Sequence, residues 1–188
     1  DIVKMLQRAG HEVASHSYLH QDLRKLNLSD LKSSIQKSTE ILSNVIREKI
    51  SGFRSPFCRY RKDLFSLLKA YGYEYDSSLH PAIVPGKYYH LFSPLSPFQI
   101  ENGIWEVPIS VIPFIRFPIS WWWMRNLGSG ITYTGTNINL LLKRNVILYF
   151  HPWEFADLPQ INKKIHCLTR NTGMKFCRQL KNFIRLYK

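Results

Sequence analysis

The chain has 188 residues, of which 45% are hydrophobic and 21% are charged, and its formal net charge is +13. This composition is typical of a globular protein and excludes a disordered or fibrous chain, and the length allows one domain with a substantial core but not two large ones. The basic residues are spread along the chain and no nucleic-acid-binding motif accompanies them, so we expect no nucleic-acid partner.

The first part of the chain alternates between helices and short strands. Amphipathic patterns and stop signals predict helices at residues 1–10, 29–48 and 62–72. Ser29 is expected to cap the second helix, and Gly72 to end the third. Short strands are expected at "HEVAS", "ISGFRSP" and "YEYDSS". Strands that alternate with amphipathic helices favour parallel βα units, and therefore an α/β fold or barrel.

The remaining chain changes character. Residues 80–135 contain seven prolines and many aromatic residues, so we expect a loop-rich insertion around one strand, "IWEVPISV". "NVILYF" is a continuous apolar run, as in a strand buried on both faces. An amphipathic helix is predicted at about residues 172–187. The whole is predicted to be a single domain, residues 1–188, and no apolar run reaches the roughly 18 residues of a membrane span.

Reactive side chains follow four of the predicted strands. "HEVAS" leads into His16 and His20, "SGF" into Arg54, "YEY" into Asp76 and "NVILYF" into His151. Because functional residues collect at the carboxyl ends of parallel strands, we expect these side chains on one rim. Two imidazoles can bind a divalent metal, and a further histidine could protonate a departing amine. The pattern points to metal-assisted hydrolysis of an amide.

These motifs, "HSYLH" after "GHEVAS", then "FRSP", "YDSS" and "LYFHPWE", resemble the polysaccharide deacetylase (NodB-homology, carbohydrate esterase 4) family. The chain is most similar to the branch that shares features with peptidoglycan deacetylases and exosortase-associated deacetylases. The resemblance implies a distorted (β/α) barrel. It also implies a hydrolase that uses a divalent metal, usually zinc, to remove acetyl groups from N-acetylated sugars of a polysaccharide or glycan.

The resemblance also implies roles for individual residues. His16 and His20 match the metal ligands, and Ser17 matches the residue that stabilises their loop by hydrogen bonds. The catalytic residues would be His151 as the acid, Arg54 as the arginine that holds the base, and Asp76 as the acidic residue that tunes the histidine. The substrate site would be lined by Pro56, Leu148 and Trp153.

One element of the family pattern is missing. The family's first motif, a strand that ends in two aspartates, supplies the base and the third metal ligand, and no Asp-Asp pair occurs in this sequence. The first residues have the pattern of a helix that began upstream. We therefore expect a truncated chain that lacks its first strand and is inactive alone. Asp22 could replace the missing ligand, but a turn residue before the next helix is the better interpretation. Glu154 is expected behind the site or at the surface.

Several alternatives stay open. The chain could be a non-catalytic glycan-binding or membrane-associated relative, or an allantoinase-like amidase. The tryptophan run at residues 121–123 could pack inside the insertion, stack on a sugar, or contact a membrane surface, and the basic C-terminal helix could dock on the core or contact a membrane. We expect an acetylated glycan substrate, a possible peripheral membrane contact, and a location in the cytoplasm or at the membrane of the cell envelope.

Overall fold

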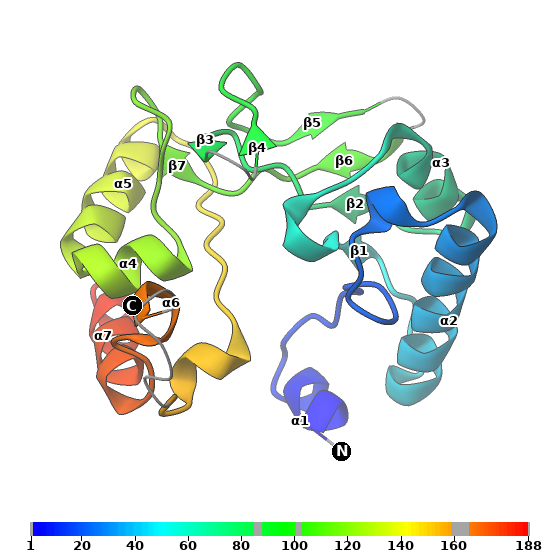
Figure 1. Cartoon of the computed structure of the whole chain (residues 1–188), viewed down its shortest axis with the longest axis horizontal. Coiled ribbons are helices and arrows are strands. Elements are labelled where there is room, and N and C mark those ends of the chain that lie inside the picture. The colour runs from blue at the N-terminus through cyan, green and yellow to red at the C-terminus, as the bar shows by residue number, and fades with distance from the viewer. Residues whose placement is uncertain (1, 85–87, 101–102, 159–165, 188) are drawn as a thin grey trace. The chain divides into compact units, whose positions relative to one another are not determined.

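The computed structural model describes residues 2–84, 88–100, 103–158 and 166–187 (Figure 1). The chain divides into two compact units, which we call unit 1 (residues 1–80 and 96–108) and unit 2 (residues 81–95 and 109–188). The boundary between them falls inside the predicted insertion. The assignment of one domain to the whole chain stays a prediction.

The helices of unit 1 lie close to their predicted positions. They are α1 (Ile2–Arg8), α2 (Leu28–Ile46) and α3 (Lys62–Ala70), with short 3₁₀ helices η1 (Leu23–Lys25) and η2 (Pro56–Cys58). The predicted cap of α2 was wrong: Asn27, not Ser29, precedes the helix, and its side-chain oxygen accepts from the backbone N–H of Asp30 at 2.8 Å. Beyond α3, Gly72 adopts the left-handed conformation (φ +83°), which supports its predicted role as a stop.

Unit 1 is built around a four-stranded sheet of order β1–β2–β6–β5. The strands are β1 (Gly52–Phe53), β2 (Tyr75–Asp76), β5 (Phe98–Gln99) and β6 (Trp105–Glu106). β1, β2 and β6 are parallel, and β5 runs antiparallel to β6. The predicted "HEVAS" strand is reduced to one parallel bridge between Ser15 and Phe53. An α/β fold is confirmed, whereas the distorted (β/α) barrel stays a prediction.

The register of this sheet aligns four residues in one row. Ser15 pairs with Phe53, Phe53 with Asp76, and Asp76 with Glu106. Since these segments are parallel, the chain leaves all of them at the same edge, where His16 and Arg54 follow. Within unit 1, the expected placement of His16 and Arg54 at one edge of the sheet is therefore confirmed, while their function stays a prediction.

A glycine sets the spacing between the first two strands. A side chain at Gly52 would collide with the ring of Tyr75, the residue opposite it in β2. The Tyr75 hydroxyl donates a hydrogen bond of 2.8 Å to Glu12 in the segment that leads to His16. One ring therefore connects β1, β2 and this first segment.

The core of unit 1 lies between its sheet and helices α2 and α3. Its largest fully buried side chains come from all three: Leu31 and Ile35 from α2, Leu64 and Leu68 from α3, and Phe53 from β1. Burial of one such side chain stabilises a fold by roughly 1.5–3 kcal/mol, so this core holds the sheet edge in place.

Unit 2 contains two small antiparallel hairpins and a group of helices. The hairpins are β3–β4 (Ile83–Val84 and Tyr88–Tyr89) and β7–β8 (Val111–Ile112 and Phe117–Pro118). The helices are α4 (Trp121–Leu127), α5 (Ser129–Leu141), α6 (His166–Thr169) and α7 (Met174–Arg185), with the 3₁₀ helix η4 (Pro152–Phe155). No helix of the described residues is long and apolar enough to cross a bilayer.

Two predictions for this part of the chain were wrong. The loop-rich insertion includes α4 and most of α5, because after Pro118 no proline interrupts the chain until Pro152 and tertiary packing holds both helices. "NVILYF" forms no strand and is only half-buried. Its hydrogen bonds are isolated: Ile147 O accepts from the Ser110 N–H, while Ile147 N and Tyr149 N donate to serine hydroxyls.

The core of unit 2 gathers around α4 and α7. Met124, Phe176 and Phe183 are buried there, with Leu148 and Phe150 packed against them. α7 agrees with the predicted C-terminal helix, and its apolar face supplies Phe176 and Phe183. The segment that leads to His151 is therefore anchored by side-chain packing rather than by a strand ladder.

Candidate metal-binding and catalytic residues

The two predicted metal ligands lie side by side in unit 1. His16 and His20 are both exposed, and their ring centroids are 4.9 Å apart with the planes at 67°. Ser17 and His20 have positive φ angles of 63° and 52°, which turn the short segment back so that its two ends meet. The Phe57 ring packs against His20 at 4.9 Å.

A backbone contact orients the first imidazole. Nδ1 of His16 lies 2.6 Å from the carbonyl oxygen of Arg54. A carbonyl only accepts, so Nδ1 carries the proton and Nε2 keeps the lone pair that a metal requires. This orientation of His16 suits a metal ligand, whereas metal binding by His16 and His20 stays a prediction. Among the described residues, no group of three or more His, Cys, Asp or Glu side chains could hold a metal ion.

The loop of the pair is not held in the way that the resemblance implies. Ser17 Oγ is buried and has no hydrogen-bond partner among the described side chains and backbone. Instead, the Tyr18 N–H donates to Ser34 Oγ of α2 at 3.3 Å. The stabilising role predicted for Ser17 was thus placed on the wrong residue.

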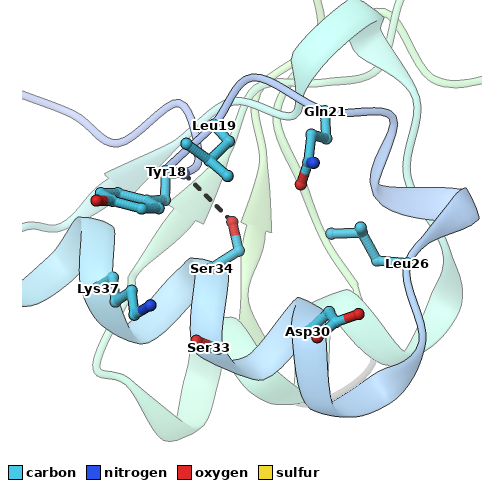
Figure 2. Close-up of a pocket in the computed structure, with 8 residues that line it drawn as sticks. All are labelled: Tyr18, Leu19, Gln21, Leu26, Asp30, Ser33, Ser34 and Lys37. Atoms are coloured by element: carbon cyan, nitrogen blue, oxygen red, sulfur yellow. Dashed lines mark hydrogen bonds between the residues drawn. The ribbon is translucent and has the colours of Figure 1, made fainter.

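A pocket of about 270 Å³ lies beside the same segment, between it and the first half of α2 (Figure 2). Tyr18, Leu19 and Gln21 line one side, and Asp30 and Lys37 the other. The Lys37 ammonium lies 5.6 Å from the centre of the Tyr18 ring. The pocket therefore offers an aromatic face and polar groups next to the histidine pair.

Arg54 is tied to the end of β2. Its Nε donates to Ser77 O at 2.7 Å and its Nη2 to Ser77 Oγ at 2.6 Å, and the Ser77 hydroxyl donates in turn to Val107 O. Pro56 is buried at the start of η2. These contacts fix the backbone whose carbonyl holds His16, while the predicted contacts of Arg54 with a base and of Pro56 with substrate stay predictions.

A buried carboxyl pair lies behind this edge. Asp76 is fully buried and accepts two hydrogen bonds from Ser78, at 2.7 and 3.1 Å, while Glu106 accepts from the Leu79 N–H at 2.8 Å. Burial raises the pKa of Asp76. Burial and the negative charge of Asp76 raise the pKa of Glu106 to about 10, so Glu106 holds a proton near neutral pH. Glu106 was not predicted from the sequence. Recognition of "YDSS" and "IWE" as neighbouring parallel strands would have revealed it.

Asp22 is a turn residue, as we predicted. It precedes η1 and accepts hydrogen bonds from the backbone and side chain of Arg24, and Arg59 lies 3.2 Å away. The hydrogen bond from Arg24 lowers the pKa of Asp22 to about 2. Both of its oxygens accept hydrogen bonds from arginines, which agrees with the turn role, and its exclusion as a metal ligand stays a prediction.

The remaining predicted residues belong to unit 2. His151 lies beside three aromatic rings, with Trp121 at 4.9 Å, Trp153 at 5.4 Å and Tyr149 at 5.6 Å between centroids. Trp153 is partly exposed, as a substrate contact requires, and Leu148 packs against the unit 2 core. The predicted residues thus fall into two groups, one in each unit.

Glu154 is fully buried rather than at the surface, and it contacts His151 directly. Its Oε1 accepts from the His151 N–H and lies 2.9 Å from His151 Nδ1. Its Oε2 accepts from Nε of Arg125, which is also buried, at 3.2 Å. The spacing of three residues between His151 and Glu154 was a signal for this contact, whereas nothing local in the sequence indicated Arg125.

Two family models match the chain, one after the other. The model of the polysaccharide deacetylase family matches residues 1–75, and the model described as a domain of unknown function (DUF3473) matches residues 77–186. A peptidoglycan deacetylase-like protein of Gibberella zeae is 32% identical over 76 residues, which are 40% of this chain and 22% of that protein. The chain thus spans about a quarter of the length of the curated relatives that it matches.

Two solved structures share the fold over nearly the whole chain. The Puue allantoinase has a TM-score of 0.63 and 15% identity, over 100% of this chain and 56% of that one. A candidate polysaccharide deacetylase from Mycobacterium smegmatis has a TM-score of 0.57 and 19% identity, over 98% of this chain and 66% of that one. At such identities the likeness concerns the fold alone.

Proposed function

Because the polysaccharide deacetylase model matches residues 1–75 and the chain belongs to the DUF3473 family, whose model matches residues 77–186, we propose that the protein removes acetyl groups from N-acetylated sugars of a glycan. The reaction would be the hydrolysis of a linear amide C–N bond. A peptidoglycan deacetylase-like relative supports this substrate class.

One observation carries the proposal, the geometry of the histidine pair. Two exposed imidazoles face each other at 4.9 Å, and the Arg54 carbonyl holds the proton of His16 on Nδ1, so that Nε2 offers its lone pair to a metal. In the proposed enzyme, His16 and His20 hold a divalent metal, most simply zinc. When bound, such a metal makes water nucleophilic near neutral pH and polarises the acetyl carbonyl.

The remaining steps fall to other residues of the chain. Arg54 orients the carboxylate that accepts the proton from water; the first motif of the deacetylase family supplies that carboxylate, and no Asp-Asp pair occurs in this sequence. Asp76, with Glu106, keeps the strand end behind Arg54 in its position. His151 protonates the nitrogen of the sugar amine as the C–N bond breaks, and such general acid catalysis is typically worth ~10²–10⁴-fold. Trp153 presents a ring face on which a sugar can stack.

The test is made on the native protein, with its N-terminus first established by intact mass and N-terminal sequencing. Acetate release from oligomers of N-acetylglucosamine is measured for the wild type and for His16→Ala, with His11→Ala, another exposed histidine of unit 1, as matched control. We expect His16→Ala to lose at least about 100-fold in rate and His11→Ala to keep it. Equal rates for all three proteins would overturn the proposal.

A second candidate, a membrane-associated glycan-binding protein, is favoured by the charge of unit 2. Unit 2 has 13 basic and two acidic residues, a net charge of +11, whereas unit 1 has 13 basic and 11 acidic residues, +2. On α7, Arg178, Lys181 and Arg185 are exposed at helical spacing, and α7 contains no acidic residue. Such a face suits anionic lipid headgroups.

Vesicle sedimentation and the acetate assay together separate the two candidates, because membrane binding is also compatible with a deacetylase. Binding to phosphatidylcholine vesicles with and without phosphatidylglycerol is measured for the wild type and for two triple variants. The first variant carries Arg178→Gln, Lys181→Gln and Arg185→Gln. The second, a control in unit 1, carries Lys4→Gln, Lys32→Gln and Lys62→Gln. The membrane candidate predicts binding that only the first triple change removes. Ring opening of allantoin, assayed in parallel with acetate release, tests the amidase alternative that the fold likeness suggests.

A further inference from the structure

The imidazole of His151 is held by a neighbouring carboxylate on its own chain segment. His151 precedes η4, and Glu154 in that 3₁₀ helix folds back so that Oε1 accepts from the His151 backbone N–H and contacts Nδ1, each at 2.9 Å. An ionised carboxylate only accepts, so Nδ1 carries a proton. The ring nitrogen that faces away from Glu154 is Nε2.

The second oxygen of the same carboxylate is also committed. Glu154 Oε2 accepts from Arg125 Nε at 3.2 Å, and neither side chain has any exposed surface. Arg125 comes from α4, and its Nη1 donates to Arg170 O at 2.6 Å, while its guanidinium lies 5.3 Å from the centre of the Trp153 ring. A buried charge is costly unless it is paired, so Arg125 balances the charge of Glu154 and fixes the position of its carboxylate.

Aromatic rings complete the setting. Trp153 stacks on the His151 ring with the planes at 25°, and Trp121 and Tyr149 meet it edge-on at 80° and 77°. The side chain of His151 remains 33% exposed. The ring therefore has a defined orientation and an accessible edge.

We propose that Glu154 and Arg125 are positioning residues for His151: they hold it with Nδ1 protonated and Nε2 presented as the proton donor. This inference rests on the proposed function. As the C–N bond breaks, its electron pair goes to nitrogen, which takes the proton from Nε2. His151 then remains as the neutral Nδ1–H imidazole, and Glu154 stays ionised.

Glu154→Gln gives a sharp test because arginine has no acceptor. Arg125 is charged and only donates, so it takes the amide oxygen. The amide NH₂ then faces His151, where Nδ1 becomes an acceptor and the backbone N–H loses its hydrogen bond. We expect the neutral ring to change from the Nδ1–H to the Nε2–H tautomer in long-range ¹⁵N–¹H NMR spectra. We expect kcat to fall by about 10–100-fold, with a smaller change in KM. Asp157→Asn, at the other acidic residue of unit 2, should change neither the tautomer of His151 nor kcat.

A double variant keeps the test valid if Glu154→Gln is poorly folded. With Arg125→Gln added, both buried groups are neutral, and the amide introduced by Glu154→Gln can again turn its oxygen to His151, so the Nδ1–H tautomer and part of kcat should return. A folded Glu154→Gln protein with unchanged tautomer and kcat would overturn the inference. His151→Ala separates the two proposals. If this variant keeps the wild-type rate, the proposed role of His151 is refuted. If it loses activity while Glu154→Gln stays fully active, only the present inference is refuted.

Discussion

The two units orient their histidines by different means. In unit 1, His16 is exposed and is held by a backbone carbonyl at the end of a sheet. In unit 2, His151 lies among aromatic rings and is held by a buried carboxylate that is paired with a buried arginine. A histidine that binds a metal needs a neutral ring with an outward lone pair. A carbonyl that accepts from the other ring nitrogen holds the ring in that form. A nearby negative charge stabilises the protonated form of a proton donor. That charge must be buried to act strongly, and it must then be balanced by a cation.

The ion pair of unit 2 should therefore give the largest effect on stability. Arg125→Ala leaves Glu154 buried without its cation, and breaking such a pair costs about 3–5 kcal/mol. The matched change in unit 1, Lys49→Ala, removes the cation from the exposed Lys49–Glu74 pair and should lower the free energy of unfolding far less. Urea unfolding followed by circular dichroism measures both. Equal losses in the free energy of unfolding for the two variants would contradict the contrast between the units.

Metal binding should depend on unit 1. Removal of one imidazole by His20→Ala should weaken zinc binding at least about 100-fold, measured by competition with a chromogenic chelator. His151→Ala should leave zinc affinity within about threefold of the wild type, if the metal is held by the histidine pair of unit 1. A loss of zinc affinity in His151→Ala as large as that in His20→Ala would contradict this division.

The buried carboxyl pair should make the stability of unit 1 depend on pH. The pKa of Glu106 is raised to about 10, so the folded state binds more protons than the unfolded state above the ordinary glutamate pKa. Stability should therefore fall as the pH rises from about 4.5 towards 10. Glu106→Gln, which imitates the protonated form, should flatten this dependence. Unfolding midpoints across the pH range, with Glu74→Gln as an exposed control, measure the difference.

The smallest effect is expected from Asp22, whose pKa is lowered to about 2. A lowered pKa means that its stabilising contribution is present above the ordinary aspartate value and is lost as the pH falls from about 4 towards 2. Asp22→Asn keeps a capping side chain but loses the charge, and should cost at most about 1 kcal/mol at neutral pH. Zinc affinity should not change, and a large loss of it would mean that Asp22 is a ligand after all.

Much of unit 1 could be predicted from the sequence because its signals are local. The helical periodicity of α2 and α3, the stop at Gly72 and the parallel strand ends that place His16 beside Arg54 all follow from short patterns. Glu106 could not be found in that way. Its position depends on which strand pairs with β2, and this pairing joins residues 30 positions apart.

Unit 2 was predicted less well because its order comes from tertiary packing. The tryptophan run of α4 and the apolar run "NVILYF" show no helical or alternating period, so local patterns predict a loop where α4 forms and a strand where none does. Arg125 and Glu154 are 29 positions apart, and only the folded unit brings them within 3.2 Å. The sequence indicated His151 as a candidate, but not the residues that orient it.

The absence of a side chain at Gly52 has a consequence for how this protein can vary. The Tyr75 ring occupies the space that a methyl group would need, and its hydroxyl is bonded to Glu12, four residues before His16. Even alanine at position 52 would displace that ring and, with it, the segment that carries the histidine pair. Natural or designed variants should therefore change positions 12, 52 and 75 together, because a single change there would displace the segment that carries His16 and His20 without altering either histidine.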